Sequence, residues 1–161
     1  MIKVDDCLLD DLLLQATESP RKRAHYNLHK SYHEPVQRLC IALQQKSYVR
    51  PHWHNNNDKW ELVVVLRGTV VVVIFDKQGV IQQKVMLSPL NGVSVLELPP
   101  NTCHSLYVTT DSAAIMEVKQ GPYDAANAAK FASWAPKEEE KDADMFLAWL
   151  RQAKPGQYFL G

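Results

Sequence analysis

The chain has 161 residues, enough for one domain with a substantial hydrophobic core. Its 18 basic and 18 acidic residues give a formal net charge of +0, which argues against proteins that bind nucleic acid or a membrane surface. Charged residues make up 22% of the chain and hydrophobic residues 46%, as expected for a soluble globular protein.

The cysteines and the amino terminus together predict a cytoplasmic protein. The cysteines are few, odd in number and widely spaced, which argues against a disulfide framework. Residues 1–6 lack the basic-then-apolar order of a signal peptide. The longest apolar stretch, residues 62–75, is interrupted by a polar turn and is too short to span a bilayer. We therefore expect a reduced, cytoplasmic environment and no membrane association.

The amino-terminal segment, residues 1–45, is predicted to be a helical extension. Asp5 or Asp6 can cap a helix that runs to about residue 18 and carries an apolar stripe of leucines. Pro35 suits the first position of a second short helix, in which apolar residues recur at helical spacing up to Leu43. Residues 24–34 show no clear period and predict an irregular connection.

Residues 46–120 have the texture of a β-sheet protein and form the predicted barrel core. Seven short runs rich in β-branched residues are separated by turn residues, a pattern typical of an antiparallel sandwich or barrel. The run from Val70 to Phe75 is apolar without alternation, which predicts a strand buried on both faces. Its second face would pack against flanking helices or another subunit, so we expect a homodimer.

The carboxyl-terminal segment, residues 121–161, is predicted to be helical again. Asp124 can cap an alanine-rich turn that continues through Lys130. Farther along, apolar residues recur at the spacing of one buried helical stripe. The members of that stripe are Met145, Phe146, Trp149 and Leu150. The three segments together predict a single domain over residues 1–161, with helices that cover the outside of the β core.

Four side chains predict a metal centre. His52 and His54 share one face of a strand because strand side chains alternate with period two. Glu61 opens the next apolar run and returns beside them if a loop over residues 55–59 closes a hairpin. His104 follows a proline-rich turn at the start of another strand. In the alternative interpretation each histidine is a surface or hydrogen-bonded residue and Glu61 a surface carboxylate.

Imidazole and carboxylate ligands accept several divalent transition metals, so the pattern leaves Fe, Mn, Ni, Co, Cu and Zn open. Three neutral imidazoles and one carboxylate around a divalent ion leave a net charge of about +1, which attracts an anionic or oxygen-rich small molecule.

These motifs resemble those of the cupins. His52-x-His54, Glu61 and Gly68 resemble the first cupin motif, and Pro99-x-Asn101-x-x-His104 resembles the second, with asparagine in the usual place of a glycine. Asparagine is the commonest non-glycine residue at positive φ, so the turn is retained. The resemblance implies a mainly β fold, the double-stranded β-helix or jelly roll, with flanking helices at both ends.

A closer resemblance extends over nearly the full length and indicates the WbuC family of cupin-fold metalloproteins, small bacterial proteins sometimes encoded among O-antigen genes. It is carried by short segments, including Asn27-Leu28-His29, Lys59-Trp60-Glu61, Gly121-Pro122-Tyr123 and Trp134-Ala135-Pro136. This family resemblance implies a role near O-antigen biosynthesis and no particular reaction.

Further polar residues are candidates for ligand binding or catalysis. Arg50 shares the strand parity of the histidines and either binds a ligand anion or is an exposed arginine. Glu117 is either a cavity-lining general acid or base or a solvent-facing carboxylate. Arg23, Tyr26 and Asn27 belong to a nitrogen-rich segment that we expect to lie across the cavity mouth or to make an interchain contact.

Two neighbours of the proposed ligands have the opposite strand parity. Trp53 is expected in the core or an interface, and Cys103 is expected to be buried filler rather than a ligand.

Three functions are compatible with these residues. The first is a metal-dependent enzyme that moves a proton on a sugar or nucleotide-sugar intermediate, as an isomerase or epimerase does. The second is an Fe(II)-dependent dioxygenase, a class that the cupin resemblance includes. The third is a non-catalytic module that binds or senses a small molecule through its metal.

Overall fold

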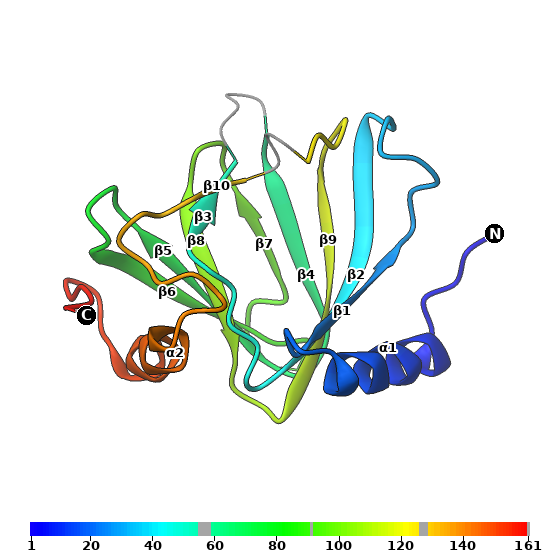
Figure 1. Ribbon diagram of the computed structural model, residues 1–161. Helices are drawn as coiled ribbons and strands as arrows, with labels where there is room; N and C mark the ends of the chain where they lie inside the picture. Colours follow the sequence, from blue (N-terminus) through cyan, green and yellow to red (C-terminus); the bar gives the residue numbers. More distant parts are fainter. Residues whose placement is uncertain (55–58, 91, 126–128, 161) are drawn as a thin grey trace.

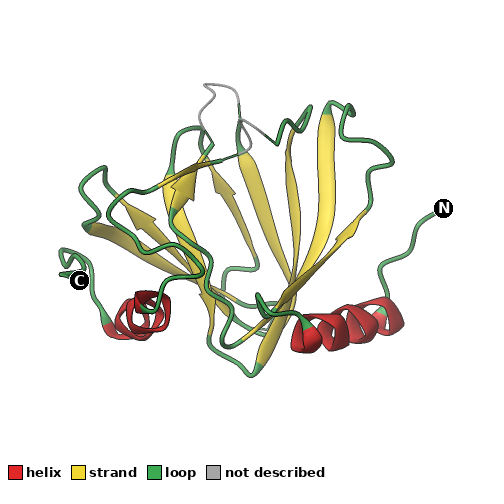
Figure 2. Cartoon of the chain, viewed as in Figure 1, coloured by secondary structure: helices red, strands yellow, loops and turns green. Residues whose placement is uncertain are grey.

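The computed structural model describes residues 1–54, 59–90, 92–125 and 129–160, and these form a two-layered β-sandwich with one helix on each outer side (Figures 1 and 2). The elements in chain order are α1 (Asp6–Glu18), β1 (Arg23–Asn27), β2 (Val36–Gln44), β3 (His52–Trp53), β4 (Glu61–Arg67), β5 (Val70–Phe75), β6 (Ile81–Leu87), β7 (Val95–Leu98), β8 (Cys103–Val108), β9 (Ser112–Gln120), β10 (Lys130–Phe131) and α2 (Asp142–Gln152).

The strands form two five-stranded antiparallel sheets. One sheet has the order β1-β2-β9-β4-β7, and the other has the order β10-β3-β8-β5-β6. From β2 to β5 and again from β6 to β10, strands that follow one another in the chain alternate between the sheets, so residues distant in sequence meet between the layers. Among the described residues, no helix is long and apolar enough to cross a membrane.

The hydrophobic interior has three parts. Between the sheets, residues such as Val63 and Ile115 of the first sheet pack with Val72 and Leu106 of the second. Outside the first sheet, Leu12 and Ala16 of α1 cover Cys40 and Ala42 of β2. Outside the second sheet, the buried face of α2 covers β5 and β8; that face consists of Ala143, Phe146, Leu147 and Leu150.

The β5 strand shows why its sequence does not alternate. Val70 and Val72 point into the sandwich, whereas Val71, Val73 and Phe75 lie in the layer beneath α2. The expected burial on both faces is therefore confirmed, and the second face is covered by a helix of the same chain. We expected a homodimer because this second face is apolar, but α2 already covers it. The homodimer therefore stays a prediction.

The second helix predicted in the amino-terminal segment is wrong, because residues 36–44 form β2. Leu39, Ile41 and Leu43 line the space between the sheets, while Cys40 and Ala42 lie under α1. A strand buried on both faces lacks alternation, and its apolar residues also fit a helical period. The irregular connection predicted over residues 24–34 is also corrected in part, since β1 begins at Arg23 and ends at Asn27.

The carboxyl-terminal predictions need smaller corrections. In α2, Phe146 and Leu150 are buried as expected, but Met145 is 50% exposed and Trp149 is only partly buried. The buried face is turned because the helix packs through Ala143 and Leu147 instead. The helical turn predicted after Asp124 falls partly on residues 126–128, outside the described residues, and Lys130 itself belongs to β10. Most of the predicted loop over residues 55–59 also lies outside them.

Two turns have the backbone that the motifs predict. Asn101 has φ +62°, so an asparagine serves where the cupin motif usually has glycine. Gly68 has φ +75°, and a Cβ there would overlap the carbonyl oxygen of Ser112 and lie 2.9 Å from Cα of Ala113. The glycine therefore allows the β4–β5 turn to approach the start of β9.

Gly68→Ala is expected to destabilise the fold by about 3 kcal/mol. The cost of a left-handed backbone at alanine and the cost of the overlap with Ser112 add to each other. Gly92→Ala is a matched control: Gly92 also has φ +75°, but its Cβ would meet nothing within 4 Å. That variant should lose only about 1 kcal/mol. Urea denaturation of both variants checks the difference, and equal losses would show that the close approach at Gly68 is unimportant.

Candidate metal centre

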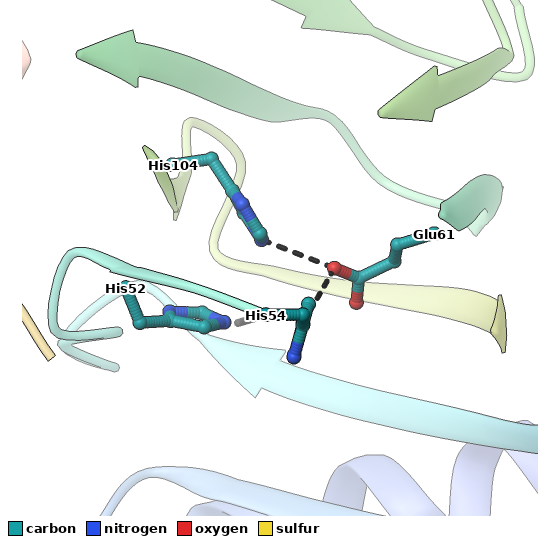
Figure 3. Close-up of side chains that lie close together, drawn as sticks. All are labelled: His52, His54, Glu61 and His104. Carbon is teal, nitrogen blue, oxygen red and sulfur yellow. Dashed lines mark hydrogen bonds and ion pairs between the residues drawn. The ribbon is translucent and has the colours of Figure 1, made fainter. Parts of the chain in front are cut away.

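Four potential ligands converge on one point between the sheets (Figure 3). His52 lies on β3 with His54 just after it, Glu61 is the first residue of β4, and His104 lies on β8 directly opposite His52 in the β3–β8 pair. One ligand atom from each residue lies within 4.8 Å of the others. The structure thus brings together the four residues from which the sequence predicts a metal site.

Backbone carbonyl oxygens orient two of the histidine rings. Nδ1 of His52 lies 2.9 Å from the carbonyl oxygen of Arg50, and Nδ1 of His104 lies 3.0 Å from that of Thr102. An Nδ1–H that donates to a carbonyl leaves the lone pair of a neutral imidazole on Nε2. This is the arrangement in which an outer partner fixes the ring of a metal-binding histidine.

The Nε2 atoms face a carboxylate oxygen, as ligands around a shared cation do. Oε2 of Glu61 is 3.1 Å from Nε2 of His54 and 3.2 Å from Nε2 of His104. Two lone-pair atoms at this distance repel unless a proton or a cation lies between them. Three imidazole nitrogens and one carboxylate oxygen are a common donor set for divalent transition metals. The residues therefore fit a metal ion by both orientation and chemistry.

Burial and charge set the protonation of the cluster. Burial on its own would raise the pKa of Glu61, but hydrogen bonds with His104 and His54 hold it well below its usual range, so Glu61 is a carboxylate. Burial, together with the charge of His104, lowers the pKa of His52 to about 3. Burial opposes protonation of His104 as well, but the hydrogen bond with Glu61 outweighs it and raises the pKa of His104.

The cluster forms part of the wall of a cavity of about 640 Å³ between the two sheets. Its deeper wall is apolar, with residues such as Leu39 and Ile41 from β2, Val63 from β4 and Leu106 from β8. Polar side chains from the first sheet and from the connections beside it complete the wall, and they include Arg23, His25, Asn27, His29, Gln37, Arg50, Glu117 and Lys119. The cavity has the size of a small-molecule site with a few polar groups on an apolar wall.

Glu117 and Lys119 lie beside the cluster on the inner face of β9. Lys119 Nζ donates a hydrogen bond to Oε1 of Glu117 and lies 4.0 Å from Oε1 of Glu61. Burial, reinforced by the charge of Glu61, raises the pKa of Glu117 to about 7. Of the two alternatives for Glu117, the structure has the cavity-lining one. Sequence reasoning missed Lys119 as a site residue, although it shares the strand parity of Glu117.

Of the other predicted ligand-binding residues, some line the cavity and others do not. Arg50 lines the cavity, where Nη2 donates to the carbonyl oxygen of Ala132 at 2.8 Å and the guanidinium lies 5.3 Å from the ring centroid of Phe131. Asn27 also lines the cavity, whereas Tyr26 is 39% exposed and is not among the lining residues. Strand parity turns Tyr26 away from Asn27 and out of the cavity wall, so of the two alternatives for Tyr26 the interchain contact stays a prediction.

Arg23 lines the cavity but already has protein partners. Its Nη1 donates to the carbonyl oxygen of Tyr48 at 2.7 Å, and its Nη2 donates to Oε1 of Glu138 at 2.5 Å. The Glu138 contact joins β1 to the segment before α2, the Tyr48 contact joins it to the connection after β2, and together they make Arg23 a structural residue of the cavity wall. Trp53 and Cys103 pack into the layer beneath α2, as their strand parity predicts.

Comparisons with known proteins agree with the fold. A family model described as a domain of unknown function (DUF6016) matches residues 4–87. The search of curated proteins found no match. Among solved structures, the chain is similar to CapF with the inhibitor 3-isopropenyl-tropolone, at a TM-score of 0.59 and 16% identity, over 70% of this chain and 32% of that one.

Two further structures are similar over most of this chain. Oxalate oxidase in complex with the substrate analogue glycolate has a TM-score of 0.54 and 14% identity, over 71% of this chain and 57% of that one. KdgF from Halomonas sp. has a TM-score of 0.51 and 16% identity, over 67% of this chain and 84% of that one. At such identities the likeness shows the fold alone, and that fold is the cupin jelly roll. The match to residues 4–87 covers more than half of the 161 residues, and the chain therefore belongs to the DUF6016 family.

Proposed function

We propose that the chain is a metal-binding cupin protein in which His52, His54, Glu61 and His104 hold one divalent transition-metal ion. The observation that carries the proposal is the convergence of their ligand atoms to within 4.8 Å in the wall of a cavity. Fe, Mn, Ni, Co, Cu and Zn all accept this donor set, so the identity of the ion stays open.

We further propose that the protein is an enzyme that transfers a proton on a small polar molecule, such as a sugar or nucleotide-sugar intermediate. When bound, the metal ion supplies Lewis acidity that polarises a carbonyl or hydroxyl oxygen of the ligand. Glu117 is positioned to exchange the proton, because it faces the cavity opposite Val63, two residues along β4 from the ligand Glu61. Lys119 holds the Glu117 carboxyl through Oε1. Arg50 is available to bind an anionic group of the ligand.

Proton exchange in deuterated water tests this activity. Metal-loaded protein is incubated with a panel of sugar phosphates and nucleotide sugars, and deuterium incorporation is followed by mass spectrometry. At least one compound should exchange a carbon-bound proton, and Glu117→Gln should lower the exchange rate by about 10²–10⁴ while the metal content stays the same. Equal exchange in this variant would exclude Glu117 as the proton-transfer group.

Two other outcomes would assign a different function. Oxygen uptake that requires Fe(II)-loaded protein would support the dioxygenase alternative. Ligand-induced melting shifts without turnover would support a binding or sensing module. Absence of exchange, uptake and melting shifts across the panel would contradict a ligand of this class.

Several finer predictions are proposals of the same kind. Membership in the WbuC family with a role in O-antigen biosynthesis, a single domain over residues 1–161, a homodimer and a cytoplasmic location are proposed from the sequence. Light scattering tests the homodimer, and a monomeric mass would reject it.

A further inference from the structure

The polar side-chain atoms that lack a partner gather at the cavity. Among the described residues, four buried side-chain atoms have no hydrogen-bond partner, and three of them belong to residues that line the cavity. These three are Nε2 of His29, Oε1 of Gln37 and Nε of Arg50. His29 and Gln37 are only 8% and 2% exposed, so water is largely excluded from both. A buried polar group without a partner is costly, which makes these atoms candidates for ligand contacts.

His29 and Gln37 lie in line with the metal centre across the first sheet. Lys119 on β9 pairs with Gln37 on one side and with Glu61 on the other. Asn27 pairs with Leu39, and Leu28 N donates to the carbonyl oxygen of Arg38 at 2.8 Å. His29 follows the end of β1, and its N and Nδ1 lie next to Arg38, the neighbour of Gln37. One row across the sheet therefore contains Gln37, Lys119 and Glu61, and His29 lies beyond its β2 end.

The row sets the separation between the metal centre and the unpartnered atoms. Neighbouring strands lie about 4.8 Å apart, so Gln37 is roughly 10 Å and His29 roughly 14 Å from Glu61 along the sheet, measured between backbones. Side chains that point into a curved sheet shorten these spans. A six-carbon ligand that contacts the metal at one end and makes a hydrogen bond at the other is long enough to span this separation.

Local contacts fix the hydrogen-bonding role of the unpartnered atom of each side chain. Gln37 Nε2 donates to the carbonyl oxygens of Glu34 at 2.8 Å and Tyr32 at 3.3 Å, so its Oε1 is an acceptor turned away from them. Nδ1 of His29 lies 2.9 Å from the carbonyl oxygen of Arg38 and 3.1 Å from its N, and that carbonyl oxygen already accepts from Leu28 N and His29 N. If Nδ1 accepts the Arg38 N–H, Nε2 carries the hydrogen and is a donor. The two atoms thus form a complementary donor and acceptor pair.

We propose that His29 and Gln37 bind a hydroxyl group at the far end of an anionic, polyhydroxylated ligand whose acid end lies at the metal centre. A hydroxyl group both donates and accepts, so it can satisfy Gln37 Oε1 and His29 Nε2 together. The acid end is assigned by charge: a divalent ion with Glu61 carries about +1, and the Glu117–Lys119 ion pair beside it adds nothing. The ligand class is therefore a sugar acid. This inference rests on the proposed metal centre.

A comparison of two six-carbon 2-hydroxy acids distinguishes binding at the far end of the site from binding at the metal centre. D-gluconate and 2-hydroxyhexanoate have the same acid end, but only D-gluconate carries hydroxyl groups along the rest of its chain. Both are titrated calorimetrically into protein that has first been loaded with one equivalent of zinc. D-gluconate is expected to bind at least about tenfold more tightly, which corresponds to the two additional hydrogen bonds.

Two substitutions at His29 test the donor atom. His29→Asn keeps a side-chain acceptor near the Arg38 N–H but removes the donor at the Nε2 position. It should weaken D-gluconate binding about fivefold to tenfold and leave 2-hydroxyhexanoate binding and zinc affinity unchanged. His29→Gln retains a donor near the Nε2 position and should preserve most of the preference. A purely structural role for His29 would weaken both acids alike in both variants.

The outcomes distinguish this inference from the metal centre itself. The zinc titration that precedes the binding experiment reports on the metal alone. Protein that binds zinc but shows equal affinity for the two acids, or no affinity for D-gluconate, would overturn the sugar-acid inference and leave the metal centre intact. Protein that takes up no zinc would contradict the proposed function and the inference that rests on it.

Discussion

His104→Ala is expected to lower the affinity for zinc by more than about a hundredfold. Loss of an outer-shell partner alone typically costs 10–100-fold in metal affinity, and this substitution removes a ligand. His104 is the ligand whose ring is fixed both by the Thr102 carbonyl oxygen and by Glu61. Its removal also leaves Glu61 with one imidazole partner fewer in a buried site. Competition with a chromophoric chelator measures the affinity.

A matched control separates ligand loss from the general effect of removing an imidazole. His33 is exposed, so His33→Ala removes the same group from the surface. This variant should bind zinc as tightly as the unchanged protein. If His104→Ala retained its zinc affinity while both variants stayed folded, His104 would not be a ligand and the four-residue centre would be wrong.

Glu138→Gln is expected to destabilise the fold by about 3 kcal/mol. The Arg23 side chain is 7% exposed, and Glu138 is the carboxylate that compensates its charge, at 2.5 Å. Breaking a buried ion pair costs about 3–5 kcal/mol because one charge is left without compensation. The lower end applies here, since Glu138 remains 20% exposed and the Tyr48 carbonyl oxygen still accepts from Arg23.

The neighbouring glutamate provides the control for this prediction. Glu139 is exposed and makes no hydrogen bond or ion pair with Arg23, so Glu139→Gln should change stability by less than about 0.5 kcal/mol. Chemical denaturation of the two variants gives both free energies of unfolding. Equal stabilities would show that the contact between β1 and the segment before α2 contributes little to the fold.

The interface between β1 and that segment also bears on the site. Arg23 and Glu138 both line the cavity, and Arg21 adds a second contact to Glu138 at 2.7 Å. These charges fix the edge of the first sheet to the carboxyl-terminal segment. Arg23, which the sequence marked for ligand binding, therefore contributes by holding the cavity wall in place.

An antiparallel sandwich or barrel could be predicted from local pattern, and the resemblance to the cupin motifs, which follow local rules, implied the cupin fold. His52 and His54 share a strand face by parity, and Gly68 and Asn101 occupy turns that require positive φ. The β2 strand could not be identified in this way. Leu39, Ile41 and Leu43 face the cavity while Cys40 and Ala42 contact α1, so burial on both sides removes the alternation that identifies a strand.

The polar residues of the first sheet that line the cavity could not be assigned to one site from the sequence either. His29 and Gln37 lie on opposite sides of a connection, and only the pairing of β1 with β2 brings His29 next to Arg38, the neighbour of Gln37. Lys119 shares the strand parity of Glu117, but its contact with Glu61 depends on the pairing of β4 with β9. Pairing between strands that are distant in sequence is a tertiary property, so local pattern does not reveal it.

Elemental analysis of gently purified protein tests the metal centre most directly. We expect one transition-metal ion per chain in the unchanged protein and less than about a tenth of that amount in the His52→Ala, His54→Ala double variant, because two of four ligands are then absent. The same metal content in both proteins, or no metal in the unchanged protein even after incubation with zinc, would contradict a centre formed by His52, His54, Glu61 and His104.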